Sequence, residues 1–228
     1  MIVNDEVKQF FNNTANEYDS YRNRVYLKKS IKKIEKILIK FNLLNKERIL
    51  DLGVGTGSLL NYLIKNYNYK TIYGIDISEE MIKISRKKIQ NGILKVSSAE
   101  EIPFDENFFD LLICIDVLEH VKDPIKVIQE ITRVLKNGGI AILSTPNPFW
   151  APIMYLAEKL KLKVKEGDHK FIFLNSLINK QKDIEVLEFG NIVSFPFNFI
   201  PNNIEEFTSS SKILSKFGFG QLVIIQKK

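Results

Sequence analysis

Apolar residues follow two different periods along this chain, and the two periods alternate. Short runs that are apolar throughout predict buried strands at 46–54, 69–78, 92–98, 109–117 and 140–146. Between them, apolar residues recur every three or four positions, which predicts helices at 56–67, 79–89 and 123–136. Strands that are apolar on both faces and alternate with helices indicate a doubly wound α/β fold, in which helices cover both faces of a mostly parallel sheet.

Local signals mark where two of these helices begin. Ser78 precedes the helix at 79–89 and suits the N-cap position, where a hydroxyl accepts from a free backbone N–H of the first turn. Asp123 precedes Pro124, and proline is favoured at the first helical position. The Asn-Gly-Gly sequence at 137–139 is predicted to end this helix before the next strand begins.

The segments outside this alternating region have a different character. Residues 147–183 mix proline, tryptophan, apolar and basic residues, whereas 184–195 and 219–228 have the pattern of two late strands. We therefore expect a single domain over 1–228, with an N-terminal helical cap at 1–45, a core at 46–146, an inserted lid at 147–183 and C-terminal strands at 184–228.

Cysteine content and hydropathy indicate the cellular compartment in which the protein is expected. The chain has 228 residues and one cysteine, Cys114, so it forms no internal disulfide, which is typical of a reducing compartment. The first ten residues lack the basic and apolar regions of a signal peptide, and no apolar run approaches the ~18 residues that a membrane helix needs. We therefore expect a cytoplasmic protein without a membrane span, in which Cys114 is a buried packing residue.

The net charge of +6 is unevenly distributed along the chain. Ten Lys and Arg residues stand against two Glu residues between Arg22 and Arg48. A basic surface of this kind attracts nucleic acid or other anionic partners. However, Ile31, Ile34 and Leu38 recur at helical spacing between the lysines, which favours the solvated face of an amphipathic helix.

A glycine-rich loop follows the first predicted strand. Gly53, Gly55 and Gly57 allow positive φ angles and a close approach of the backbone to a ligand. The spacing differs from the dinucleotide fingerprint G-x-G-x-x-G because the third glycine comes one position early, and a P-loop would need a lysine directly after it. Asp51 before the loop repels a phosphate, so a cationic ligand fits the loop better than a phosphate does.

A second acid, Asp76, ends the second predicted strand, nineteen residues after Gly57. A carboxylate at this place can accept hydrogen bonds from both ribose hydroxyls of an adenosine cofactor. The alternative is a structural loop acid that binds nearby backbone N–H groups.

Four segments in register resemble the class I S-adenosylmethionine-dependent methyltransferases. They are "ILDLGVGTGSLL" (49–60), "YGIDIS" (73–78), "VSSAEEIPFDENFFDLLICIDVLEHV" (96–121) and "LKNGGIAILSTPNP" (135–148). The sequences "VLEHV" and "STPN" are most similar to the branch that contains the ubiquinone-biosynthesis O-methyltransferases and related small-molecule methyltransferases. The resemblance covers about residues 10 to 147. It implies a Rossmann-like sheet of seven strands, mostly parallel with one late antiparallel strand, and 46–146 as the cofactor-binding core.

The resemblance also implies S-adenosyl-L-methionine as the cofactor, S-adenosylhomocysteine as the product, and a set of contacts. The implied contacts are Asp51, Gly53, Gly55 and Gly57 with the methionine part, Asp76 with the ribose, Ile77, Ser98, Ala99 and Glu100 around the adenine, the backbone of Cys114 and Ile115, and Tyr18, Tyr21 and Arg22 near the methionine carboxylate. Ser98 departs from the family, which usually has aspartate there, so we expect weaker adenine recognition at this position.

Both histidines of the chain are candidates for a general base that would activate an acceptor hydroxyl. His120 follows the fourth predicted strand, and His169 lies in the predicted lid. The alternative for His120 is a capping role in the turn. Glu119 and Asp116 adjoin His120, but these residues offer no clear third ligand, and we expect no metal site.

The leading hypothesis is a methyltransferase that acts on a small molecule, at oxygen in preference to nitrogen or carbon. An RNA methyltransferase that uses the basic segment is the alternative, although the sequence has no recognisable RNA-binding module and no "NPPY"-type motif after the fourth strand. A cofactor-binding module without catalysis also fits the intact loop, and an NAD-dependent oxidoreductase fits it least. The sequence does not set the oligomeric state.

Overall fold

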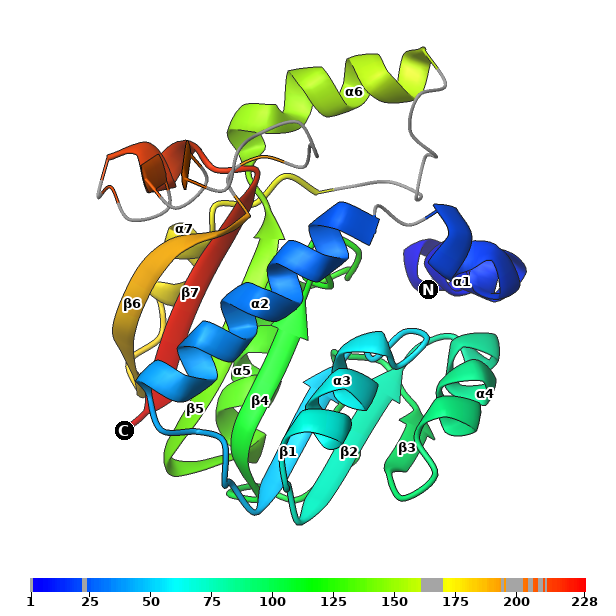
Figure 1. The fold of residues 1–228 in the computed structure, drawn as a ribbon, viewed down its shortest axis with the longest axis vertical. Coiled ribbons are helices and arrows are strands. Elements are labelled where there is room, and N and C mark those ends of the chain that lie inside the picture. The colour runs from blue at the N-terminus through cyan, green and yellow to red at the C-terminus, as the bar shows by residue number, and fades with distance from the viewer. Residues whose placement is uncertain are drawn as a thin grey trace.

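The computed structural model describes residues 2–21, 24–160, 170–193, 195, 203–204, 207–208, 211 and 213–228 (Figure 1). The strands are β1 (Arg48–Leu52), β2 (Thr71–Asp76), β3 (Ile93–Val96), β4 (Phe109–Ile115), β5 (Leu135–Pro146), β6 (Ile184–Val193) and β7 (Gly220–Lys227). The helices are α1 (Ile2–Tyr21), α2 (Arg24–Lys40), α3 (Ser58–Asn66), α4 (Glu79–Lys88), α5 (Pro124–Val134), α6 (Ala151–Lys159) and α7 (Leu174–Ile178), with short 3-10 turns η1 (Pro148–Trp150) and η2 (Leu214–Phe217).

The strands form a seven-stranded sheet in the order β3-β2-β1-β4-β5-β7-β6. The neighbours from β3 to β5 pair in parallel, whereas β7 is antiparallel to both β5 and β6. This arrangement confirms the predicted doubly wound sheet with one late antiparallel strand. The strand order reverses at β1, which places the glycine loop after β1 at the topological switch point, where such sheets bind ligands.

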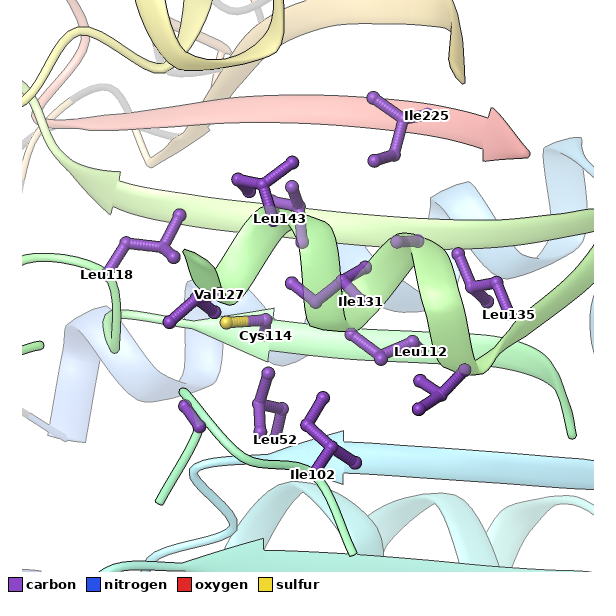
Figure 2. Packing of buried hydrophobic residues seen from close by; sticks show 14 of the residues in the cluster. Leu52, Ile102, Leu112, Cys114, Leu118, Val127, Ile131, Leu135, Leu143 and Ile225 are labelled. Carbon is purple, nitrogen blue, oxygen red and sulfur yellow. The ribbon is translucent and has the colours of Figure 1, made fainter. Parts of the chain in front are cut away.

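The core consists of two layers, one on each face of the sheet. Neighbouring residues of a strand enter opposite layers: Leu50 packs with α5 and α7, whereas Ile49 packs with α2 and α3. Figure 2 shows the first layer, where Val127 and Ile131 of α5 pack against Cys114 and other side chains of the sheet. Both predicted helix starts are also present, since Oγ of Ser78 accepts from N of Met81 (3.1 Å) and Asp123 caps α5.

The prediction that the Asn-Gly-Gly sequence ends α5 is wrong. The helix ends at Val134, and β5 already begins at Leu135, which is fully buried and pairs with Phe109. The glycines instead accommodate an irregularity within the strand. Gly138 has a φ of +78°, and a Cβ on Gly139 would lie 2.8 Å from O of Lys136. A side chain there would clash with the bent backbone, so glycine is required.

The segments outside the core region have separate positions. Helix α1 packs beside α4, near the carboxyl ends of the strands, and α2 crosses the front face of the sheet (Figure 1). Within 147–183, α6 lies beyond the carboxyl ends of the strands and has a single buried residue, Met154. Helix α7 differs, because Leu174, Leu177 and Ile178 are buried in the core beside α5. This part of the predicted lid therefore packs on one face of the sheet.

Candidate cofactor site

The glycine loop is held by the end of the neighbouring strand. The backbone N–H groups of Gly53 and Val54 both donate to O of Ile75 in β2, at 2.8 and 2.9 Å. Gly53, Gly55 and Gly57 have φ angles of +80°, +52° and +79°, as the sequence predicts for a loop that turns sharply before a helix. Helix α3 begins directly after Gly57, so its free N–H groups lie next to the loop.

The space beside each glycine differs. A Cβ on Gly53 would lie 2.2 Å from Cγ2 of Val117, and one on Gly57 would lie 2.8 Å from Cδ1 of Ile89. A Cβ on Gly55 would meet no atom within 4 Å. The loop is thus packed against protein at its two ends and faces open space at its middle. This is the arrangement that a small ligand cradled by the backbone requires.

Asp76 connects β2 with the loop. Its Oδ2 accepts from N of Gly55 (2.8 Å), and its Oδ1 accepts from N of Ser78 (2.9 Å). Burial raises the pKa of the Asp76 carboxyl to about 6, although these backbone donors act in the opposite direction. The contacts match the structural alternative for Asp76, and each oxygen keeps a further lone pair for a ligand hydroxyl.

Asp51, the other acid of the loop region, is the fourth residue of β1 and is 4% exposed. It pairs along the sheet with Gly74 of β2 and Ile113 of β4. The structure therefore brings together the two acids and the three glycines that the sequence predicts as a binding site. Ile77, which follows β2 directly, is half-buried at the same end of the sheet.

Helix α1 closes this end of the sheet through contacts that the sequence analysis missed. Asp19 accepts from Oγ1 of Thr56 in the loop (2.7 Å) and forms an ion pair with Lys88 of α4 (2.6 Å). Oδ1 of Asn12 accepts from Oγ of Ser78 (2.7 Å). No spacing in the sequence relates these partners, which lie 37 to 69 positions apart.

The residues of α1 that the resemblance does implicate are described in part. The ring of Tyr18 packs edge-on against Phe11, with centroids 6.0 Å apart. Tyr21 ends α1, but its side chain lies outside the described part of the structure, as does the whole of Arg22. Their implied contacts with the methionine carboxylate stay predictions.

Three of the four residues implied around the adenine follow β3 and have contacts of their own. Oγ of Ser98 accepts from N of Glu100 (3.2 Å), and Ala99 is buried in the core layer below. Oε1 of Glu100 accepts from N of Asp123 (2.6 Å), directly before α5. Glu100 therefore positions the start of α5, a structural contact that the sequence analysis did not anticipate.

Cys114 is fully buried, and its side chain faces the layer that contains α5 (Figure 2). Burial raises the pKa of its thiol well above the usual range, which keeps the sulfur protonated and unreactive. This confirms Cys114 as a packing residue. The next residue, Ile115, is half-buried at the end of β4 on the opposite face.

Polar residues cluster after β4. Asp116 has a φ of +55°, and its Oδ1 accepts from the hydroxyls of Tyr26 (3.1 Å) and Ser144 (3.2 Å). Oε2 of Glu119 accepts from Oγ1 of Thr145 (2.9 Å). In the described part of the chain, no group of three or more His, Cys, Asp and Glu residues is arranged to hold a metal ion.

His120 lies in the same turn and is 8% exposed. Its ring packs edge-on against Phe11 of α1, with centroids 5.4 Å apart, and its backbone N–H donates to O of Val117 (3.0 Å). The imidazole therefore lies between the end of β4 and helix α1, which also contacts the glycine loop through Asp19. His169, the other candidate, lies outside the described residues.

The fold and the site define a doubly wound α/β domain with a glycine-rich backbone cradle and a buried acid, Asp76, at its switch point. Known proteins agree with this class. A family described as a methyltransferase domain matches residues 50–143. A protein of Methanocaldococcus jannaschii is 32% identical over 215 residues, which cover 92% of this chain and 93% of that protein. The ubiquinone biosynthesis O-methyltransferase of Vibrio cholerae is 31% identical over 173 residues, 71% of this chain and 69% of the relative.

The fold is similar to that of solved methyltransferases. Magnesium protoporphyrin IX methyltransferase from Synechocystis, with bound S-adenosylhomocysteine, has a TM-score of 0.71 at 17% identity and covers 99% of this chain and all of its own. The chain belongs to the class I S-adenosylmethionine-dependent methyltransferases. It is an enzyme whose cofactor is S-adenosyl-L-methionine. Within the described residues, no helix is long and apolar enough to cross a membrane.

The pKa of Asp76 leads to a prediction for cofactor binding. The ionised carboxylate accepts hydrogen bonds from ribose hydroxyls better than the protonated form does. With a pKa of about 6, the ionised fraction falls about tenfold between pH 7 and pH 5. We expect the affinity for S-adenosylhomocysteine to weaken by about the same factor when calorimetric titrations are compared at the two pH values.

Protein stability should move in the opposite direction. The folded-state pKa of Asp76 lies above the ordinary 3.8, so its stabilising contribution is complete below about pH 4 and is lost as the pH rises through 6. Protonation of Asp76 therefore does not destabilise the folded protein, so weaker binding at low pH would report the loss of the ionised carboxylate and not unfolding. The variant Asp76→Asn should remove the pH dependence of binding, and a dependence that survives this substitution would assign it to another group.

Proposed function

We propose that the enzyme transfers the methyl group to a hydroxyl oxygen of a small molecule. The observation that carries this proposal is the place of His120, a buried imidazole between the end of β4 and the helix α1 that closes the cofactor loop. The name of the Vibrio cholerae relative, an O-methyltransferase, adds support. His169, the other candidate base, lies outside the described residues, and its role stays a prediction.

The chemistry asks little of the protein beyond alignment and removal of a proton. S-adenosylmethionine supplies a methyl group bound to a sulfonium sulfur, which keeps the bonding pair when the methyl group leaves. The chain has to orient the acceptor in line with that bond and exclude water. His120 would accept the hydroxyl proton as the oxygen forms its bond to carbon, which makes the oxygen a stronger nucleophile.

Product analysis tests the acceptor atom. The enzyme is incubated with S-adenosylmethionine carrying a ¹³C-methyl group and with a panel of phenols, catechols, aromatic amines and quinols. We expect a methoxy carbon in the NMR spectrum of the product. An N-methyl or C-methyl carbon as the main product would refute oxygen as the acceptor, and methyl transfer to RNA but to no small molecule would favour the RNA alternative.

The variant His120→Ala tests the base. We expect kcat for the best phenolic acceptor to fall ten- to hundredfold, since general-base catalysis typically contributes at least this much. The dissociation constant of S-adenosylhomocysteine should stay within about twofold, because no residue of the glycine loop is changed. A control variant, Thr132→Ala, removes a hydroxyl that donates to O of Ile128 within α5 (2.8 Å) and should retain kcat. Normal turnover of His120→Ala would exclude the histidine as the base.

A further inference from the structure

The exposed large hydrophobic side chains are concentrated at one end of the molecule. Of the seventeen in the described residues, thirteen lie between residues 149 and 217, and all of these except Phe189 lie outside strand β6. This end holds α6, η1 and η2, beyond the carboxyl ends of the strands (Figure 1). Soluble monomers rarely expose so many neighbouring apolar groups unless the surface contacts something.

Helix α6 presents an apolar stripe to the solvent. Ile153, Leu156 and Leu160 follow one another at intervals of three and four residues, so they share one face, and each is more than half exposed. The opposite side of α6 is held by Met154, which is 5% exposed. An amphipathic helix normally buries its apolar face, whereas this one is attached by a single buried side chain and leaves the stripe uncovered.

Three aromatic rings extend the stripe onto neighbouring segments. Phe149 of η1 contacts Phe173 and Phe217, with ring centroids 5.7 and 5.1 Å apart. The indole N–H of Trp150 donates to O of Phe217 (2.9 Å), which joins η1 and η2. We refer to the six exposed side chains Phe149, Ile153, Leu156, Leu160, Phe173 and Phe217 as the α6 patch.

Exposed lysines adjoin the α6 patch in the sequence. Lys159 and Lys216 are exposed next to Leu160 and Phe217 of the patch in the sequence, and neither of them forms an ion pair with a carboxylate in the described part of the chain. An apolar surface with a cationic margin matches the two layers of an anionic membrane, since apolar side chains enter the acyl boundary and lysines contact the headgroups.

We propose that the α6 patch docks this enzyme peripherally on a membrane that carries anionic headgroups. Helix α6 has nine residues, too few to span a bilayer, so it would lie in the plane of the surface. A second copy of the chain fits the patch less well, because a two-fold contact would bring the lysines of both copies together. The bilayer would then face the end of the sheet that holds the cofactor loop.

Vesicle binding tests this proposal. Wild type is sedimented with vesicles of phosphatidylcholine alone or with about one third phosphatidylglycerol. We expect binding to the anionic vesicles, at least tenfold weaker binding to the neutral ones, and further weakening at high salt. Trp150 is the single tryptophan of the chain, so a blue shift of its emission on binding would locate the contact at the α6 patch.

Two double variants separate the patch from exposed apolar residues in general. Ile153→Ser with Leu156→Ser should weaken anionic vesicle binding at least tenfold, whereas Ile39→Ser with Ile64→Ser, which are exposed on α2 and α3, should leave it unchanged. Both should bind S-adenosylhomocysteine like wild type. Equal binding by the two variants, or no vesicle binding by wild type, would overturn the proposal. A wild-type dimer that the first variant converts to a monomer, without vesicle binding, would assign the patch to a second copy.

Discussion

The variant Asp76→Ala is expected to bind S-adenosylhomocysteine about a hundredfold more weakly than wild type in a calorimetric titration. A hydrogen bond to a charged group contributes about 1.5–3 kcal/mol, and the carboxylate would accept from two ribose hydroxyls. The substitution also removes the acceptor of the Gly55 N–H, which fixes the middle of the loop. Both effects lower affinity.

Loss of the Asp76 carboxylate also affects folding, so a matched control is needed. Ser78→Ala removes the cap of α4 and the hydroxyl contact with Asn12, and it should lower the free energy of unfolding by about 1 kcal/mol. Because Ser78 contributes no group to the predicted ribose contact, its affinity should stay within a few fold of wild type. Equal affinities of Asp76→Ala and wild type would mean that the ribose is held elsewhere.

Alanine at Gly53 should mainly lower the stability of the protein, whereas alanine at Gly55 should mainly lower its affinity for the cofactor. Gly53→Ala places a methyl group 2.2 Å from Val117, and it should lower the melting temperature markedly because the loop backbone has to move. Gly55→Ala meets no protein atom and should cost folding only about 1–2 kcal/mol for its left-handed conformation. Its methyl group enters the space beside the middle of the loop, so we expect cofactor affinity to fall about a hundredfold.

The pair of glycine variants has an internal control. Val117→Ala combined with Gly53→Ala removes the methyl group that the new Cβ would meet, and should restore part of the lost stability. Thermal unfolding and calorimetric titration are carried out on wild type, the two single glycine variants and the double variant. The melting temperature reports how the loop packs, and the affinity for S-adenosylhomocysteine reports its contact with the cofactor. If Gly55→Ala binds S-adenosylhomocysteine as tightly as wild type, the cofactor does not approach the loop at its middle.

Much of the fold follows from local patterns. The alternation of apolar strands and amphipathic helices gives the parallel sheet, and Ser78 and Asp123 begin their helices as expected because capping depends on neighbouring residues alone. The predicted end of α5 fails for the opposite reason. Leu135 joins β5 through its pairing with Phe109, a contact made across the sheet that overrides the local preference of the glycines.

The part of the candidate site that lies at the ends of the parallel strands is predictable from the sequence. The part that depends on contacts with the distant helix α1 is not. The spacing of the glycines and the position of Asp76 after a strand place them at one edge of the sheet. Asn12 and Asp19 reach the same edge from α1 through side-chain contacts that depend on how this helix packs beside α4. The contact between His120 and Phe11 arises in the same way.

A calorimetric titration of the full chain with S-adenosylhomocysteine at pH 7.5, with NAD as the comparison ligand, tests the cofactor assignment most directly. We predict one molecule of S-adenosylhomocysteine bound per chain and no measurable heat from NAD. Binding of NAD in the absence of any binding of S-adenosylhomocysteine would contradict the account.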